Sequence, residues 1–420
     1  MIAVREAIMN KEHTKNTISE LLQAVKWIFL SLITGVVCGM AGVLFHLAID
    51  FAEDTFFAHP RVLFLLPAAG VLIAALYRGC RIPVSTGTDS VFEDIRSHET
   101  LPDILPPLIF TGSFLTHLCG GSSGREGAAL QLGGGIAHFG GKLLGFGRDE
   151  VHTLELCGMG AVFSALFGTP VGAAFFVIEV IDVGFIHYKA LFPCLLSSFS
   201  AFLLAQVFEV PPTRFVLPDG LSGGVTAVTV SRVLVLAALC GLISILFCHV
   251  MQKTAKAERR IIKNDYLRAA VFGALVAVMT LISGTHDYNG GGMQIVKRAI
   301  EEDTVPWAWA LKLLFTAVTL GAGFKGGEIV PAFYVGATFG CFASAFLGIS
   351  PALGAAIGMT ALFCGVTNTP TASLLLALEI FSGKYLVFFA LACGVSYFIS
   401  GRSSLYHSQA FLESKFAWEK

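Results

Sequence analysis

The chain has 420 residues, of which 55% are hydrophobic and only 14% are charged, and its mean hydropathy is +0.74. A soluble domain of this size needs far more charge to cover its surface, so the composition predicts a polytopic membrane protein. The net charge of −1 gives no support for nucleic-acid binding.

Residues 1–26 carry charges of both signs, and we expect them to form an amphipathic lead at the membrane surface. By the positive-inside rule, basic residues mark the cytoplasmic side, so the lead and a later basic cluster are predicted to be cytoplasmic. We expect both termini to lie on that side of the cell membrane. The basic residues of the two segments are Arg5, Lys11, Lys15 and Lys26, and then Lys253, Lys256, Arg259, Arg260, Lys263 and Arg268.

Several apolar windows are long enough to cross a bilayer as helices. Trp27–Ile49 contains 23 residues without a Lys, Arg, Asp or Glu, and Val233–Met251 contains 19 more. Leu191–Phe208 and Ala269–Ser283 are weaker candidates. Residues 209–224 are rich in Pro, Gly and polar groups, which predicts a linker between a first membrane repeat at 27–208 and a second at 225–420.

The two halves contain the same short motifs, about 200 residues apart. A long-period repeat in an apolar chain is typical of transporters built from two related halves, whose substrate site lies at the membrane midplane. The recurring motifs are Gly158-Met159-Gly160-Ala161, Gly168-Thr169-Pro170 and Ile178-Glu179, repeated as Gly358-Met359-Thr360-Ala361, Asn368-Thr369-Pro370 and Leu378-Glu379, together with Gly121–Glu126, which aligns with Gly323–Glu328.

The segment Ser85–Ser90 opens a short polar stretch in which Thr86, Gly87 and Thr88 are candidate anion-binding residues. The Thr86 hydroxyl has the chemistry to donate a hydrogen bond to an anion. A plain helix-capping role for Thr88, Asp89 or Ser90 is an equal alternative.

Glu126 lies within Gly124-Arg125-Glu126-Gly127 and is followed by an uncharged stretch. An ionisable group at membrane depth is by default a functional candidate. The free N–H groups of a helix start attract anions, so a carboxylate at this position is expected to compete with a free anion and to be released by protonation. The alternative is a carboxylate that caps its own helix and pairs with Arg125.

The second-half counterpart is Gly326–Pro331, whose glycines and proline again predict a helix start. The backbone N–H groups of Glu328 and Ile329 are expected to be free to bind an anion. Lipid-facing backbone cannot be irregular, so the glycine-rich breaks in both halves are expected to be buried or to line a wet cavity.

An intramembrane serine protease is the competing class of function. Gly121-Ser122-Ser123-Gly124 contains a Gly-x-Ser-Gly match, with His117, His138 or His187 as the possible base. The duplication has no role in that chemistry, so we expect no enzymatic activity. Neither the ten single cysteines nor the separated histidines His46, His249 and His286 indicate a metal site or a cofactor.

Taken together, these motifs resemble those of the CLC family of chloride channels and proton-coupled anion antiporters, over residues 27–412. Gly124–Gly127 is similar to the motif that contains the family's gating glutamate, and Gly326–Pro331 is similar to the second-half motif. Leu405-Tyr406 resembles the Leu-Tyr pair whose phenol coordinates the central anion. The resemblance implies an all-α fold of two inverted-topology repeats with short, tilted and broken helices, in a homodimer embedded in the lipid bilayer.

Four departures from the family pattern refine the expected function. Ser85–Asp89 alters the usual serine contact, and Ala128 replaces the motif proline. The inner proton-relay glutamate of many chloride/proton antiporters would fall at Val180, and Glu328 stands where most chloride-selective members have an apolar residue. This combination resembles the bacterial fluoride/proton antiporter branch, although residues 85–90 lack the methionine that this branch often has there.

The resemblance therefore implies fluoride/proton antiport, that is, fluoride export, gated by Glu126. A chloride channel or a chloride/proton antiporter is the alternative, with chloride in place of fluoride as the transported ion. An ionised Glu328 would repel an anion, whereas a protonated one can donate a hydrogen bond, so we expect Glu328 to be neutral when the central site is filled.

Overall fold

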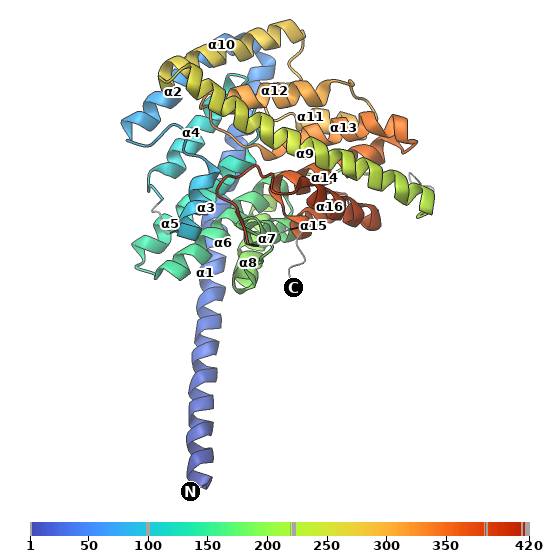
Figure 1. Cartoon of the computed structure of the whole chain (residues 1–420). Coiled ribbons are helices and arrows are strands. Elements are labelled where there is room, and N and C mark those ends of the chain that lie inside the picture. Colours follow the sequence, from blue (N-terminus) through green and yellow to red (C-terminus); the bar gives the residue numbers. More distant parts are fainter. Residues whose placement is uncertain are drawn as a thin grey trace.

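The computed structural model describes residues 2–97, 101–218, 220, 224–381, 383, 385–412 and 415, and the side chains from residue 20 onward. These residues form sixteen α-helices and two short strands, β1 (Asp182–Val183) and β2 (Ala410–Phe411), which pair in parallel (Figure 1). The helices are α1 (Ile2–Ala58), α2 (Leu66–Gly79), α3 (Thr88–Ser97), α4 (Leu105–Leu118), α5 (Glu126–Leu143), α6 (Arg148–Phe167), α7 (Pro170–Glu179), α8 (Leu191–Val207), α9 (Ala227–Ile261), α10 (Asp265–Ser283), α11 (Met293–Ile300), α12 (Ala308–Gly321), α13 (Ile329–Leu347), α14 (Pro351–Thr367), α15 (Pro370–Ile380) and α16 (Leu386–Ser400).

The helices repeat in two sets of eight, and each helix of α2–α8 has a counterpart of similar length in α10–α16, whereas α1 is much longer than α9. The paired helices α5 and α13 start at the two glycine-rich motifs, and α7 and α15 both start at a proline that follows a threonine. Proline is favoured at this position because its missing N–H would have no partner in the first helical turn anyway. The repeat seen in the sequence is therefore a repeat of structure.

Two glutamates, one at the end of α7 and one near the end of α15, link the two halves by equivalent contacts. Each carboxylate bonds to the start of the other glutamate's helix. The Glu179 carboxylate, at the end of α7, accepts hydrogen bonds from the backbone N–H groups of Thr371 and Ala372, at 3.1 and 2.7 Å. Glu379 accepts the equivalent two N–H groups at the start of α7, at 3.0 and 2.7 Å. Each carboxylate thus satisfies donors that a helix start leaves without partners.

Glycines allow the longer helices of each half to cross at very short range. A Cβ atom added at Gly133 of α5 would lie 2.1 Å from the carbonyl oxygen of Gly158 in α6. In the second half, a Cβ at Gly336 of α13 would lie 2.4 Å from the carbonyl oxygen of Gly358 in α14. The small-residue packing common between membrane helices therefore explains this subset of the glycines.

Six helical segments of the described chain are long and apolar enough to cross a membrane. Four of them, Glu20–Ala58, Tyr188–Val207, Ala227–Ile261 and Asp265–Ser283, contain the windows predicted from sequence, apart from Phe208 at one end. The other two were not predicted, because their apolar stretches are short and interrupted by Gly and Pro; they are Pro60–Gly79 and Ile329–Leu347.

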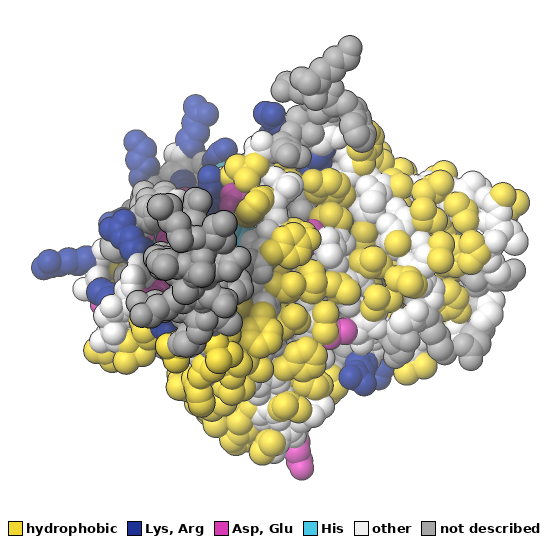
Figure 2. Space-filling model, turned by 90° about the horizontal axis from the view of Figure 1, so that it is seen from below, with side chains coloured by type: hydrophobic (Ala, Val, Ile, Leu, Met, Phe, Trp, Pro, Cys, Tyr) yellow, Lys and Arg dark blue, Asp and Glu magenta, His cyan; other side chains and the backbone are white. Residues whose placement is uncertain are grey.

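The surface has the character expected of a protein in lipid. Figure 2 shows a face with a broad hydrophobic area, on which most of the visible Lys and Arg side chains gather toward one edge. Many large apolar side chains on the membrane-length helices are exposed, among them Phe29 and Ile33 of α1 and Leu281 and Ile282 of α10.

The predicted boundaries of the repeats remain predictions. Helix α1 continues without a break across residue 26, so the lead and the first span form one helix. Residues 219 and 221–223 of the predicted linker lie outside the described residues.

Candidate anion site

The two glycine-rich motifs meet each other directly. The Gly124 N–H donates to the Gly327 carbonyl at 2.7 Å, and the Gly327 N–H donates to the Gly124 carbonyl at 2.6 Å. A Cβ atom at Gly327 would lie 2.3 Å from the backbone nitrogen of Gly127, so no other residue fits this crossing. The starts of α5 and α13, which are far apart in the sequence, are thereby held against each other in the interior.

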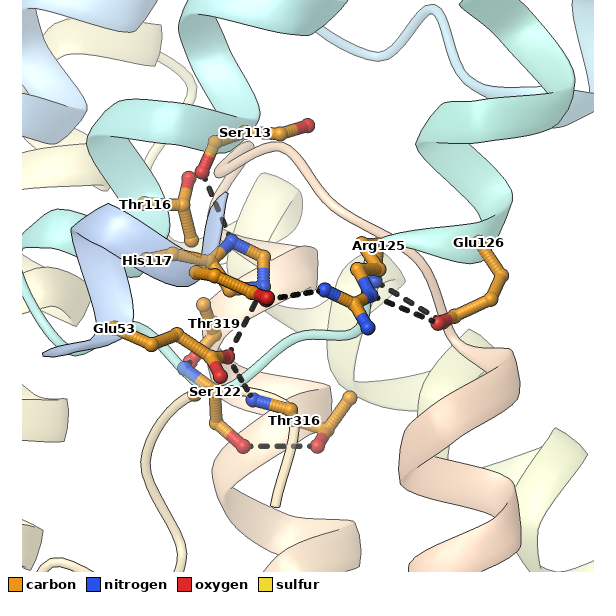
Figure 3. A network of polar contacts seen from close by, with 12 residues as sticks. Glu53, Ser113, Thr116, His117, Ser122, Arg125, Glu126, Thr316 and Thr319 are labelled. Carbon is orange, nitrogen blue, oxygen red and sulfur yellow. Dashed lines mark hydrogen bonds and ion pairs between the residues drawn. The ribbon is translucent and has the colours of Figure 1, made fainter. Parts of the chain in front are cut away.

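Glu126 is buried at the first position of α5, with 1% of its surface exposed. Its carboxylate accepts a hydrogen bond from the Arg125 N–H at 3.0 Å and lies 3.8 Å from Nε of the Arg125 side chain (Figure 3). The Arg125 guanidinium also donates to Asp50 of α1 at 2.5 Å. The described conformation is therefore the one in which the Glu126 carboxylate occupies its own helix start.

A buried polar network lies on the side of Arg125 away from Glu126 (Figure 3). The Glu53 carboxylate accepts a hydrogen bond from the Gly291 N–H at 2.8 Å and lies 3.7 Å from Nε2 of His117. Lys312, fully buried in α12, donates to the carbonyls of Tyr288 and Gly290 at 3.2 and 2.6 Å. These contacts fix the loops that surround Arg125.

Glu328 immediately precedes α13 and is half-buried, and its buried Oε2 atom has no hydrogen-bond partner in the described part of the chain. A Cβ atom at Gly127 would lie 3.0 Å from that oxygen and 3.2 Å from the Thr88 hydroxyl, so the three groups adjoin. Among the described residues, neither the Glu328 N–H nor the Ile329 N–H bonds to a carbonyl. The Ile329 side chain is fully buried.

The start of α3 is fixed by two contacts to the other segments. The Lys325 ammonium donates to the carbonyls of Val84 and Thr86 at 2.7 and 2.9 Å, and lies 4.0 Å above the ring of Tyr77. The Thr88 hydroxyl donates to the Gly127 carbonyl at 3.2 Å. A buried positive charge with backbone carbonyls as its hydrogen-bond partners remains available to attract an anion.

Tyr406 brings the C-terminal segment to the same place. Its ring meets Phe92 of α3 edge to face at 4.9 Å, and its buried hydroxyl has no partner among the described residues. Glu328, Asp89 and Glu126 are acidic residues close enough to influence this phenol electrostatically. An unpartnered buried hydroxyl is a donor ready for a ligand.

A cavity of 180 Å³ lies between these groups. Five of the seven predicted site residues line it, namely Thr86, Gly87, Thr88, Glu328 and Tyr406. The other two, Glu126 and Ile329, are buried next to it but are not among its lining residues.

A wider cavity of 630 Å³ continues from the first one. Both are lined by Val84, Ser85, Arg259 and Arg268. The wider cavity is also lined by Arg78, Arg81 and Lys263, with Asp265 as its carboxylate. An opening with this excess of positive charge favours the entry of anions.

Two alternatives raised by the sequence do not match the contacts. In the described chain no hydrogen bond joins His117, His138 or His187 to Ser122 or Ser123, and the Ser122 hydroxyl bonds to Thr316 instead. The capping role considered for Thr88, Asp89 and Ser90 is not seen either, because these residues bond to Gly127, Ser408 and the Gly87 carbonyl respectively, and not to the free N–H groups of α3. The alternative raised for Glu126 does match the contacts, since its carboxylate accepts the Arg125 N–H and lies beside the Arg125 guanidinium.

Sequence reasoning did not single out Lys325 or Gln131. Gln131, one turn into α5, donates to the Thr88 hydroxyl at 3.3 Å and lines the smaller cavity. The signal for Lys325 was a lysine within a run of glycines in an apolar chain. Gln131 had no signal, because a glutamine in a helix is ordinary.

Comparisons with known proteins agree on a family. The family model for voltage-gated chloride channels matches residues 69–401. A chloride/fluoride channel protein of Pseudomonas syringae pv. tomato is 32% identical over 97% of this chain and 91% of its own length. An H(+)/Cl(−) exchange transporter of Vibrio vulnificus is 23% identical over 86% of this chain and 83% of its own length.

Solved structures give the same result. The crystal structure of a CLC-type fluoride/proton antiporter superimposes with a TM-score of 0.89 and 30% identity, covering 93% of this chain and 99% of that one. A cyanobacterial Cl−/H+ antiporter, at 17% identity and a TM-score of 0.77, shares the fold. The chain is therefore a multi-pass membrane protein of the voltage-gated chloride channel (CLC) family.

Proposed function

We propose that this protein exchanges fluoride for protons across the cell membrane, with Glu126 as the gate and proton acceptor. The observation that carries the proposal is the contact between Gly124 and Gly327, which brings two helix starts together with the buried Glu126 and the half-buried Glu328. The similarity to a fluoride/proton antiporter over nearly the whole chain supports fluoride as the ion.

Fluoride holds its water tightly, so a fluoride site needs several strong donors to replace that water. Around the smaller cavity these are the Thr86 hydroxyl, the Tyr406 phenol and the N–H groups at the start of α13, with Lys325 close by. A neutral Glu328 adds one more donor. We assign entry from the cytoplasm to the basic wider cavity, with both termini on that side.

In this mechanism an anion and the Glu126 carboxylate compete for the same helix start. Protonation removes the negative charge of Glu126, which releases the side chain and lets an anion pass. The ionised carboxylate then returns when the anion leaves. One proton is thereby coupled to anion movement without the inner relay, whose position is taken by the buried Val180.

A chloride channel is the second candidate, and Val180 is the observation that favours it. Purified protein in liposomes, loaded with either fluoride or chloride and with pH recorded, distinguishes the candidates. We expect an outward fluoride gradient to drive protons inward against their own gradient, with much slower chloride movement. Rapid chloride flux without proton movement would show a channel.

A further inference from the structure

A second group of buried titratable side chains lies away from the anion site. It consists of Asp94 of α3, His138 of α5 and Glu155 of α6, whose ligand atoms all lie within 4.8 Å of one another. Nδ1 of His138 is 2.7 Å from Oε1 of Glu155 and 3.0 Å from Oδ2 of Asp94. Glu155 is completely buried, and the other two are nearly so.

The hydrogen bonds within this cluster leave its polar atoms unsatisfied. Nδ1 carries at most one hydrogen, so it cannot serve both carboxylates well. Oε2 of Glu155 and Nε2 of His138 are buried without a hydrogen-bond partner among the described residues, and Oδ2 of Asp94 has the contact with Nδ1 of His138 but no well-aligned hydrogen bond. Buried carboxylate oxygens without donors are unfavourable unless a cation or a proton compensates them.

The surrounding charges do not balance the two carboxylates. The lysines and arginines closest along the chain have other partners, since Arg96 pairs with Asp182 and Lys142 pairs with Asp103. No Lys or Arg forms an ion pair with the cluster in the described chain.

We propose that Asp94, His138 and Glu155 bind a divalent transition-metal cation such as Zn²⁺. Two carboxylates and one imidazole are a ligand set that Zn²⁺ accepts at about 2.0–2.2 Å, which in a tetrahedral site separates the ligand atoms by about 3.4 Å. The two separations from Nδ1 of His138, 2.7 and 3.0 Å, are shorter than that value, so the carboxylates would have to move away from the imidazole by less than about 1 Å to hold the cation. Asp94 and His138 keep slight exposure, which leaves room for a water ligand.

The proposed metal would join helices that also build the anion site. Thr88 begins α3 about 9 Å before Asp94, and Glu126 begins α5 about 18 Å before His138, at the rise of an α-helix. A cation at the cluster would thus fix the far ends of both helices. The site goes beyond the proposed transport function and is tested separately from it.

The test uses full-length protein without an affinity tag, treated with a chelator, dialysed and titrated with Zn²⁺ by calorimetry. We expect saturable binding of about one Zn²⁺ per chain and a higher melting temperature with Zn²⁺ present. Glu155→Gln should weaken binding at least tenfold. His249→Gln, which changes an exposed histidine of α9, is the control and should bind as the wild type does.

Absence of saturable Zn²⁺ binding to the wild-type protein would by itself overturn the proposal. The charges of Asp94 and Glu155 would then be balanced by protons shared with His138. Equal binding by wild type and Glu155→Gln would also overturn it, because the Zn²⁺ would then lie elsewhere. Asp94→Asn provides the same comparison if Glu155→Gln does not fold.

Discussion

At the scale of single residues, the candidate anion site contains polar atoms that are buried without a hydrogen-bond partner in the described chain. The Glu328 carboxyl and the Tyr406 hydroxyl both adjoin the smaller cavity, and each has a polar atom without a hydrogen bond in the described chain. Because an unsatisfied buried polar atom is costly, such groups persist where a ligand or a proton completes them.

For Glu328 we predict that the neutral form is the working form when an anion is bound. Glu328→Gln keeps the size of the side chain and a hydrogen-bond donor but cannot ionise. Initial fluoride efflux from liposomes should therefore stay within about threefold of the wild-type rate, a change of less than 1 kcal/mol in the barrier. Complete loss of efflux would show that the charged form, or proton exchange at this residue, is required.

For Tyr406 we predict a transport defect without a loss of stability. Tyr406→Phe removes a hydroxyl that has no partner in the protein, so the melting temperature should stay unchanged or rise slightly. Fluoride efflux should fall about tenfold, as expected for one lost hydrogen bond to an ion. Tyr334→Phe is the matched control, since the Tyr334 hydroxyl is also buried without a partner in the described chain but does not line the cavity. Equal transport defects in both variants would contradict the role of the Tyr406 hydroxyl as a donor to the anion.

At the scale of helices, close crossing between glycines determines how α5 and α13 are held. Gly133→Ala would place a methyl group 2.1 Å from the Gly158 carbonyl, so α5 and α6 must move apart. We expect a loss of about 1–3 kcal/mol in stability, typical of overpacking, measured as a lower melting temperature in detergent.

The control for this prediction is in the same helix. A Cβ atom at Gly140 meets nothing within 4 Å, so Gly140→Ala should be neutral or stabilising by up to about 1 kcal/mol because alanine favours the helix. If Gly133→Ala melts at the wild-type temperature, the close crossing does not limit stability.

The sequence predicted these elements unequally, for physical reasons. The motif around Glu126 and its second-half counterpart were recognisable because charge and glycine are rare together in an apolar chain. The contact that the two Gly-rich loops make with each other was not predicted, since backbone pairing between distant loops leaves no periodic pattern. The hydrogen bonds that Glu179 and Glu379 accept from the start of each other's helix were not predicted either, although both glutamates end a repeated motif.

At the scale of the whole molecule, duplication explains why the site is internal. The two sets of eight helices pack so that the start of α5 in the first half faces the start of α13 in the second half. The glycine-rich segments before these two helices lie largely inside the protein. Irregular backbone at membrane depth is tolerated only in such protected positions. The homodimer implied by the family resemblance stays a prediction, for which the mass of the purified protein in detergent is the check.

The whole-molecule account depends most on Glu126 as the group that couples anion and proton movement. Its direct test compares wild type and Glu126→Gln in liposomes, with fluoride and pH recorded together. We predict that the wild type moves protons against their gradient when fluoride flows, and moves fluoride faster at low pH because protonation releases the carboxylate. Glu126→Gln should still conduct fluoride but move no protons and lose the pH dependence. Continued proton pumping by Glu126→Gln would contradict the account.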